Sequence, residues 1–299
     1  MSTTTYHSVH LAVRQGIDLA YAEAGDRTAP TLILLHGFPT SSNQYRHLIP
    51  CLSDKYHVLA PDLPGFGSTV VHGDSSNLTF SDLADALEGF VDALGVKTFA
   101  VYIFDYGAPT ALRFALRRPG AITALISQNG NAYTEGLGDF WAPVKALWAT
   151  ERGTPAFDAA LAPLAGVLTL EATKAQYTGH GTPADRLDRI DPATYTLDYY
   201  QNLAGHADTQ VSLFYDYRNN VGLYPQFQAW LRDSRVPVLA VWGAGDEIFV
   251  PAGAEAFKRD AADAEVHLLD GGHFLLETHV DEVAALIRAF LERIKFGAA

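Results

Sequence analysis

The chain has a single cysteine, few charged residues and no excess of basic ones, and each shortage excludes a class of protein. Cys51 is the only cysteine in 299 residues, so an intramolecular disulfide framework and a thiolate metal cluster are both excluded. Charged residues make up 18%, and the formal net charge is −13. This balance leaves no basic patch to neutralise the phosphates of a nucleic acid, and it disfavours strongly anionic substrates.

Targeting and membrane-spanning segments are also missing from the sequence. Residues 1–14 contain no apolar stretch of the kind found in secretory signals. No apolar run approaches the ~20 residues that cross a bilayer. Internal repeats and low-complexity segments are absent as well. We therefore expect a cytoplasmic protein that has neither a membrane nor a nucleic acid as a partner.

What the sequence does contain is an alternation of short apolar runs with amphipathic helical segments. With 48% hydrophobic residues, the chain can bury one large core. Strands that alternate with helices predict an α/β fold, in which helices cover both faces of a mostly parallel sheet. A hairpin around Gln15-Gly16, within residues 8–23, is expected at the sheet edge. The other predicted strands cover residues 31–35, 56–60, 98–104, 121–127, 236–242 and 265–269.

The alternation stops between residues 129 and 222. This stretch has helical patches, is rich in tryptophan and tyrosine, and is interrupted by prolines. The pattern predicts a helical cap at residues 131–222, inserted into a core formed by residues 1–130 and 223–299. A helical lobe that only covers sheet surface would give the same pattern. The helices expected here cover residues 144–149, 157–170, 195–203 and 211–217.

A carboxylate stands at the end of the most apolar predicted strand. Asp105 follows Val101-Tyr-Ile-Phe104, and the small residues Gly107 and Ala108 suit a tight turn into the next helix. Burying a charged group costs free energy unless the group is hydrogen-bonded. A strand, a nucleophile and a helix in this order form a nucleophile elbow, here with aspartate where serine is commoner. The alternative is an aspartate that caps the helix.

Two further loops carry polar groups after strand ends. Asp246 lies in Trp242-Gly-Ala-Gly-Asp-Glu247, and His273 lies in Asp270-Gly-Gly-His-Phe274. Ligands of open α/β sheets gather outside the carboxyl ends of the strands, so we expect these groups to meet Asp105 there. The order nucleophile, acid, histidine is that of α/β-hydrolase triads.

These stretches resemble the α/β-hydrolase superfamily over nearly the whole chain. The similarity is to the branch with an aspartate nucleophile, which includes epoxide hydrolases and haloalkane and fluoroacetate dehalogenases. No Gly-x-Ser-x-Gly motif occurs, which disfavours a serine esterase. The matching segments are His36-Gly-Phe-Pro-Thr-Ser-Ser42 with Arg46, Asp62-Leu-Pro-Gly-Phe-Gly67, Asp105-Tyr-Gly107, Gly245-Asp246 and Gly272-His273.

The resemblance implies a covalent mechanism. Asp105 attacks an sp³ carbon and forms an alkyl ester, His273 activates the water that hydrolyses the ester, and Asp246 orients His273. The backbone N–H groups of Phe38 and Tyr106 would hold the oxyanion. The acid could also stand at residue 129, as in some dehalogenases, but the amide of Asn129 carries no charge, so Asp246 is preferred. No metal and no organic cofactor is implied.

The leaving group is less well defined by the sequence. Epoxide hydrolases donate to the departing alkoxide from two cap tyrosines, and Tyr217 resembles the second. The first is expected near residues 148–155, where the chain has no tyrosine. Tyr177, Tyr195, Tyr199 or Tyr200 would have to replace it.

A halide needs N–H donors instead, usually tryptophan after the nucleophile and asparagine or a second tryptophan elsewhere. Here those two fixed positions hold Tyr106 and Phe38, so Trp141 or Trp148 would have to contribute. The neighbourhood of the nucleophile also lacks the arginines that clamp fluoroacetate.

We therefore expect an epoxide hydrolase that converts a small, apolar to moderately polar organic substrate and water to a diol. Tyr217, Trp148 and His36 are the predicted contacts to substrate or leaving group. The alternatives are a dehalogenase with the same triad and, in another class, a hydrolase-fold ligand receptor or a cofactor-independent luciferase-type oxygenase.

Overall fold

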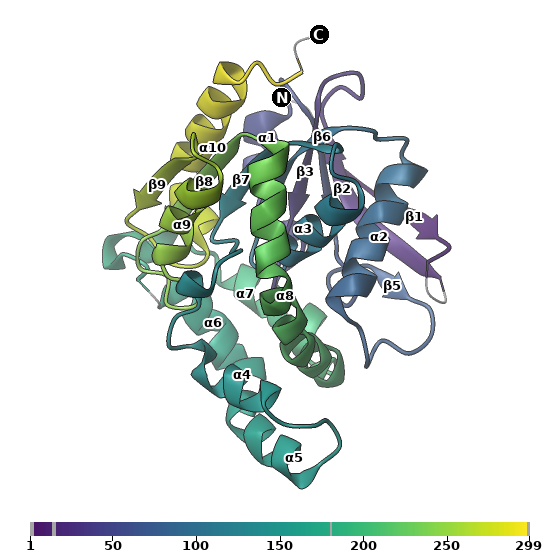
Figure 1. The fold of residues 1–299 in the computed structure, drawn as a ribbon, viewed down its shortest axis with the longest axis vertical. Coiled ribbons are helices and arrows are strands. Elements are labelled where there is room, and N and C mark those ends of the chain that lie inside the picture. Colours follow the sequence, from purple (N-terminus) through teal and green to yellow (C-terminus); the bar gives the residue numbers. More distant parts are fainter. Residues whose placement is uncertain (1–2, 14–15, 180, 298–299) are drawn as a thin grey trace.

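The computed structural model describes residues 3–13, 16–179 and 181–297, and it arranges the described strands in one sheet (Figure 1). The order is β1-β2-β4-β3-β6-β7-β8-β9, and β5 also pairs with β2. The predicted hairpin is confirmed by an antiparallel β1–β2 pair, although Gln15 at its expected turn lies outside the described residues. The strands are β1 (Thr5–Leu11), β2 (Ile17–Ala24), β3 (Thr31–Leu35), β4 (His57–Pro61), β5 (Val70–Val71), β6 (Phe99–Phe104), β7 (Ile122–Gln128), β8 (Val238–Gly243) and β9 (Glu265–Leu269).

The middle of the sheet is parallel and buried on both faces. β3 pairs in parallel with β4 and β6, and the parallel pairing continues from β6 through β7 and β8 to β9. Every residue of β6 and β8 is buried, which explains why these strands appear in the sequence as continuous apolar runs and not as alternating ones. The carboxyl ends of these strands therefore meet at one edge of the sheet.

Helices cover both faces of the sheet, as predicted. One face packs against α2 (Phe80–Ala93), α3 (Gly107–Arg117) and α9 (Ala252–Asp260), and the other against α1 (Leu48–Leu52) and α10 (Leu275–Arg293). Helix α2 begins with a capping box. Thr79 accepts a hydrogen bond from the N–H of Asp82, whose side chain in turn accepts from the N–H of Thr79.

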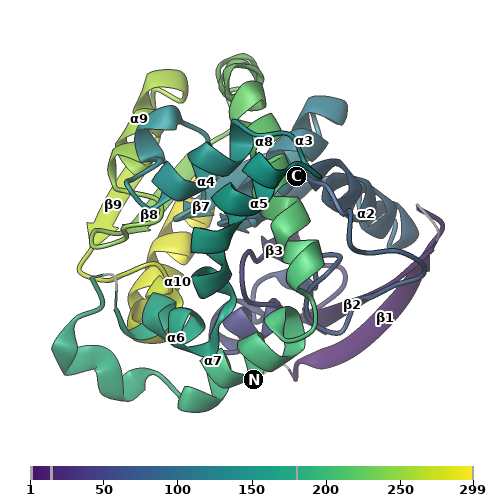
Figure 2. The ribbon, with the colours of Figure 1, turned by 90° about the horizontal axis from the view of Figure 1, so that it is seen from below.

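The segment between β7 and β8 is helical and covers one edge of the sheet (Figure 2). It contains α4 (Trp141–Trp148), α5 (Pro155–Leu161), α6 (Leu170–Thr178), α7 (Pro192–Asp198) and α8 (Ala207–Ser234), with a π-helical stretch at Tyr199–Leu203. The boundary expected at residue 222 falls inside α8, which continues past Pro225. We name residues 129–237 the insertion.

None of the described helices is by itself long and apolar enough to cross a membrane. One bent pair within the insertion, Pro155–Leu168 with Leu170–Thr178, passes the same test of length and composition when its two parts are taken together.

Candidate active site

Asp105 lies at a sharp turn between β6 and α3. Its φ of 45° is in the left-handed region, which is strained for a residue with a side chain, and its exposed fraction is only 4%. Two glycines allow the neighbouring chain to come this close. A Cβ at Gly107 would lie 2.2 Å from the carbonyl oxygen of Leu35, and one at Gly37 would lie 2.2 Å from Asp105 Oδ1. This strand–turn–helix geometry is that of a nucleophile elbow.

The two backbone amides predicted as oxyanion donors converge on Asp105. The N–H groups of Phe38 and Tyr106 each donate to Asp105 Oδ1, with N···O distances of 2.6 Å. Two short bonds from backbone donors stabilise a buried carboxylate. They also fix the place at which negative charge on this oxygen would be held.

His36 shapes the loop that carries Phe38. Its Nε2 accepts from the N–H of Leu63 at 2.8 Å, so its Nδ1 carries the proton and donates to the carbonyl of Gly37 at 3.1 Å. Burial lowers the pKa of His36, which keeps the imidazole neutral. Because both ring nitrogens bond backbone groups, the structure does not support the prediction that His36 contacts substrate.

His273 and Asp246 meet at the same edge of the sheet. His273 Nδ1 donates to Asp246 Oδ2 at 2.8 Å, which leaves Nε2 as the unprotonated nitrogen. Among the described residues, Nε2 has no hydrogen-bond partner. Asp246 Oδ1 accepts from the N–H groups of Ile248 and Phe249, at 2.8 and 3.2 Å. These bonds fix the position of the carboxylate behind the imidazole.

Asn129 supports Asp246 and does not replace it. Its Nδ2 donates to Asp246 Oδ2 at 2.6 Å, and its Oδ1 accepts from the N–H of Gly243 at 3.1 Å. Asn129 has a φ of 51°, a conformation that asparagine tolerates better than most residues. In the structure Asn129 orients the carboxylate behind His273.

The charges of the site are coupled. Burial raises the pKa of Asp105 to about 6, against the opposing effects of His273 and of the two amide donors. The pKa of His273 is also raised, because the charge and hydrogen bond of Asp246 and the charge of Asp105 outweigh its burial. Near pH 7 Asp105 is therefore ionised. If Asp105 became a neutral ester, one of the charges that raise the pKa of His273 would disappear, and His273 would be freer to act as a base.

Aromatic side chains close the space around Asp105. The ring of Tyr217 lies 4.5 Å from that of Trp141, 5.4 Å from Phe80 and 6.0 Å from Tyr106, measured between centroids. Phe38 packs against Phe214 of the insertion at 5.0 Å. Asp105, His273 and Tyr217 are all buried.

Each of the four tryptophans uses its indole N–H for a backbone carbonyl. Trp148, which we predicted as a leaving-group contact, donates to the carbonyl of Phe214, and its ring stacks on Tyr217 with centroids 6.2 Å apart. This bond makes its N–H unavailable, so the structure argues against that role. The other three tryptophans donate as follows: Trp141 to Ile248 at 2.8 Å, Trp242 to Phe249 at 2.6 Å and Trp230 to Pro119 at 3.4 Å.

Tyr217 has a hydroxyl partner that sequence reasoning missed. Its oxygen lies 3.4 Å from that of Tyr224, which accepts from Asn131 Nδ2 at 3.2 Å. Both tyrosines are buried on α8, seven residues apart and so on one helix face. That spacing was visible in the sequence, but Gly222 and Pro225 obscured the helix. Of the proposed substitutes, Tyr177 donates its hydroxyl to Asp198, and Tyr200 is 64% exposed.

Asp198 makes the stability of the fold depend on pH. Burial raises its pKa to about 8, whereas an unfolded aspartate titrates near ~3.9. Between these values the folded protein holds a proton that the unfolded chain lacks. Stability should therefore fall as pH rises from about 4 to 8, by roughly 1.4 kcal/mol per pH unit for this group. Asp198→Asn should remove this dependence. The melting temperature of the variant should therefore rise relative to that of the wild type as pH increases from 5 to 8. Parallel curves would contradict the assignment.

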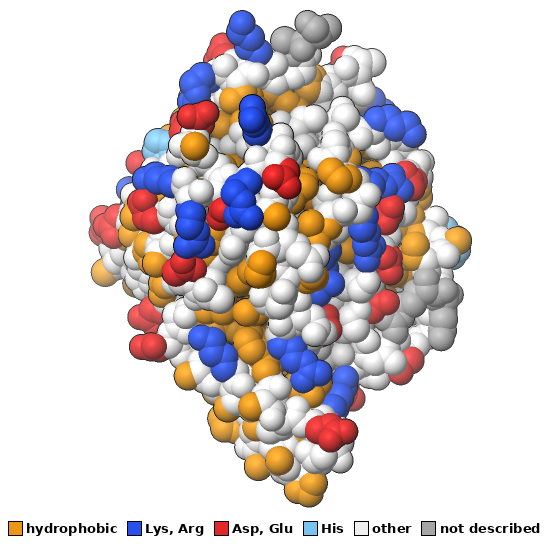
Figure 3. Space-filling model, in the orientation of Figure 1, with side chains coloured by type: hydrophobic (Ala, Val, Ile, Leu, Met, Phe, Trp, Pro, Cys, Tyr) orange, Lys and Arg blue, Asp and Glu red, His pale blue; other side chains and the backbone are white. Residues whose placement is uncertain are grey.

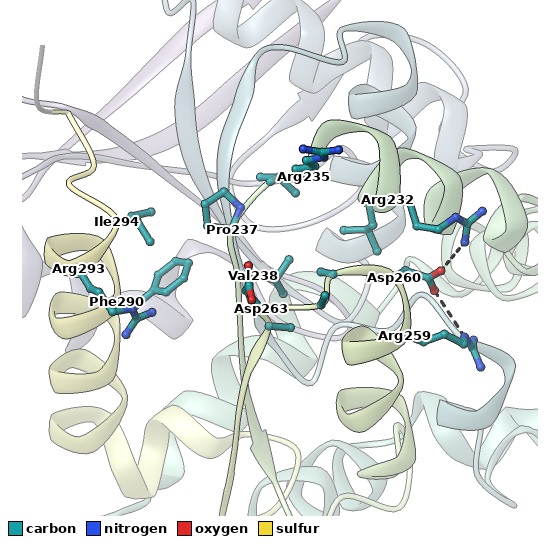
Figure 4. A pocket seen from close by; sticks show the side chains of 15 residues that line it. Arg232, Arg235, Pro237, Val238, Arg259, Asp260, Asp263, Phe290, Arg293 and Ile294 are labelled. Carbon is teal, nitrogen blue, oxygen red and sulfur yellow. Dashed lines mark hydrogen bonds and ion pairs between the residues drawn. The ribbon is translucent and has the colours of Figure 1, made fainter.

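An open cavity of about 670 Å³ lies at the opposite end of β8, beside Val238 (Figure 4). Of the four arginines that line it, Arg293 pairs with Glu265. Asp260 pairs with Arg232 and, at 3.6 Å, with Arg259. The face drawn in Figure 3 likewise intersperses basic and acidic side chains. The cavity lies at the amino end of β8, away from the candidate active site.

Residues 30–280 match the family model described as alpha/beta hydrolase fold. The chain is an α/β-hydrolase. An uncharacterized hydrolase of Saccharomyces cerevisiae is 45% identical over 290 residues, which is 96% of this chain and 97% of the yeast protein. Epoxide hydrolase 3 of Xenopus tropicalis is 26% identical over 97% of this chain and 80% of its own.

Among solved structures, the haloalkane dehalogenase DbeA of Bradyrhizobium elkani has a TM-score of 0.74 at 22% identity. The match covers 99% of this α/β-hydrolase and 100% of the dehalogenase, and it shows a shared fold. The α/β-hydrolase described here thus has relatives among both epoxide hydrolases and haloalkane dehalogenases.

Proposed function

We propose that this α/β-hydrolase opens epoxides through a covalent ester on Asp105. The observation that carries the proposal is the kind of donor near the carboxylate. The indole N–H groups that could hold a halide are bonded to backbone carbonyls. Tyr217, in contrast, is buried with its ring 6.0 Å from that of Tyr106, the residue after Asp105, and its hydroxyl lies 3.4 Å from that of Tyr224. A departing alkoxide can take a proton from a hydroxyl, but a halide has no need of one.

In the first step an oxygen of Asp105 attacks an epoxide carbon. The carbon–oxygen bond breaks, and the alkoxide takes the proton of Tyr217, with Tyr224 and Asn131 as polar support. In the second step His273 Nε2 accepts a proton from water, and the hydroxide adds to the ester carbonyl. The amides of Phe38 and Tyr106 hold the resulting oxyanion. Collapse releases the diol, and the two protons of the water end on the diol and on Tyr217.

The insertion acts in this proposal as a cap. It supplies Tyr217 and the aromatic side chains that exclude water while the ester forms. The cap corresponds to the insertion predicted from the sequence, with its last helix, α8, extending to Ser234.

The proposal is tested by offering the enzyme a terminal epoxide and, separately, a bromoalkane of similar size. A diol without halide release from the second compound supports the proposal. Halide release would instead assign the site to a dehalogenase. Conversion of neither, across a panel of chain lengths, would favour a receptor or an oxygenase that retains the fold.

Tyr217→Phe tests whether the leaving group takes a proton from this hydroxyl, as an alkoxide would and a halide would not. Loss of a general acid reduces turnover by about 10²-fold or more, so epoxide opening should fall by this amount, with most of the loss in kcat. Tyr215→Phe is the matched control, because it removes a hydroxyl on the same helix that donates to the carbonyl of Thr150. Equal effects of the two changes on kcat would contradict the role of Tyr217.

A further inference from the structure

The strands β1, β2 and β5 form one edge of the sheet (Figure 1). Two histidines and an aspartate come together there, outside the candidate active site. The strand register explains why. His10 on β1 stands directly opposite Asp18 on β2, and Asp18 stands opposite Val70 on β5. His72 follows Val70 by two residues, and its N–H donates to the carbonyl of Gly16. Direct and diagonal neighbours of this kind share one face of a sheet.

The three side chains already converge on one another. His10 Nδ1 lies 2.7 Å from Asp18 Oδ1, and His72 Nε2 lies 2.8 Å from Asp18 Oδ2. One ligand atom from each residue lies within 4.8 Å of the other two. Gly16 leaves room between the rings, since a Cβ there would lie 3.3 Å from His10 Cε1 and 3.5 Å from His72 Cδ2.

We propose that His10, Asp18 and His72 form a binding site for a transition-metal dication, with Zn²⁺ as the best match. Two imidazoles and a carboxylate are a donor set that zinc favours, and water completes the tetrahedron. With ligands at roughly 2.0–2.2 Å, neighbouring donor atoms stand about 3.4 Å apart. The three ligand atoms already lie within 4.8 Å of one another, so the exposed side chains can reach this spacing by local adjustment. Side-chain exposures of 64%, 42% and 48% leave an entry path open to the ion.

Charge distinguishes this site from a similar group on the same strands. Glu23 also stands between two histidines, His7 at 3.4 Å and His57 at 2.7 Å, but Arg27 donates to it at 2.6 Å and supplies the positive charge. Within the described residues, Asp18 pairs with His10 and His72 and with no arginine or lysine. An incoming cation would take the place of the protons shared between these side chains.

A bound ion would join the β1–β2 pair to a segment 54 residues further along the chain. His10, Asp18 and His72 belong to β1, to β2 and to the residue after β5. The ion would therefore stabilise this edge of the sheet without a part in the hydrolase chemistry. Because protons compete for the imidazole nitrogens, binding should weaken in acid.

Calorimetric titration of tag-free protein with ZnCl₂ at pH 7.5 tests the site. We expect one saturable site, a higher melting temperature with zinc, and at least tenfold weaker binding in both His10→Ala and His72→Ala. His7→Ala is the matched control, because it removes a histidine of the same strand that also faces a carboxylate, and it should bind as the wild type does. Circular dichroism verifies that each variant is folded. An absence of saturable binding to the wild type, or equal binding by all three variants, would overturn the proposal.

Discussion

Replacing Asp105 by asparagine is expected to lower kcat/KM for the substrate at least about a thousandfold. The amide keeps an oxygen that can accept from the N–H groups of Phe38 and Tyr106, so the loop geometry is preserved. It cannot act as the nucleophile that forms an ester, however, and removal of a covalent nucleophile costs most of the rate enhancement. Steady-state kinetics measure the loss, and mass spectrometry verifies that the amide has not hydrolysed back to the acid.

Stability measurements distinguish a lost nucleophile from a damaged fold. Burial raises the pKa of Asp105 to about 6, so the folded state holds a proton between pH ~4 and 6 that the unfolded chain lacks. Above this window the ionised group disfavours folding. Asp105→Asn should therefore unfold at the same temperature as the wild type or a higher one at pH 8, while activity is lost. An inactive variant with a lower melting temperature would leave misfolding as the explanation, and an active one would contradict the mechanism.

Replacing His273 by glutamine is expected to stop the reaction halfway. Ester formation requires an ionised Asp105 and a donor for the leaving group, and neither depends on a base. Hydrolysis of the ester requires His273, whose Nδ1–H is fixed by Asp246. The variant should consume about one equivalent of epoxide per enzyme molecule and release almost no diol, with turnover reduced by roughly 10³-fold or more.

Rapid-quench analysis of substrate consumption measures this stoichiometry. His267→Gln is the control, because it changes a partly exposed histidine on β9 and should leave turnover intact. If the His273 variant neither consumes epoxide nor releases diol, then His273 is needed before the ester forms, and the two-step scheme is wrong for this protein.

The layout of the site was predictable because it depends on topology. Continuous apolar runs identify buried parallel strands, and parallel strands place the loops of Asp105, Asp246 and His273 at one edge. The start of α2 at Thr79 was equally predictable, since a capping box is written in adjacent residues. Such features rest on local patterns, which a single sequence contains.

The side-chain contacts within the insertion were less predictable, because they depend on packing. Pro225 lacks an N–H and usually ends a helix, yet α8 continues through it, and the buried Tyr224, Phe227 and Trp230 offset the lost bond. The direction of a side-chain N–H is equally unreadable, as Trp148 and His36 show: both were predicted to face substrate, and both bond backbone groups. Tyr224 was not predicted as a neighbour of Tyr217, because this depends on the length of α8.

Intact-mass measurement of His273→Gln after incubation with a terminal epoxide tests the central claim most directly. We expect the protein to gain the mass of one epoxide molecule, and peptide mapping to locate the addition on Asp105. The double variant Asp105→Asn, His273→Gln should gain nothing. An unmodified His273→Gln protein that has nevertheless consumed epoxide, or an adduct on any other residue, would contradict the covalent role of Asp105.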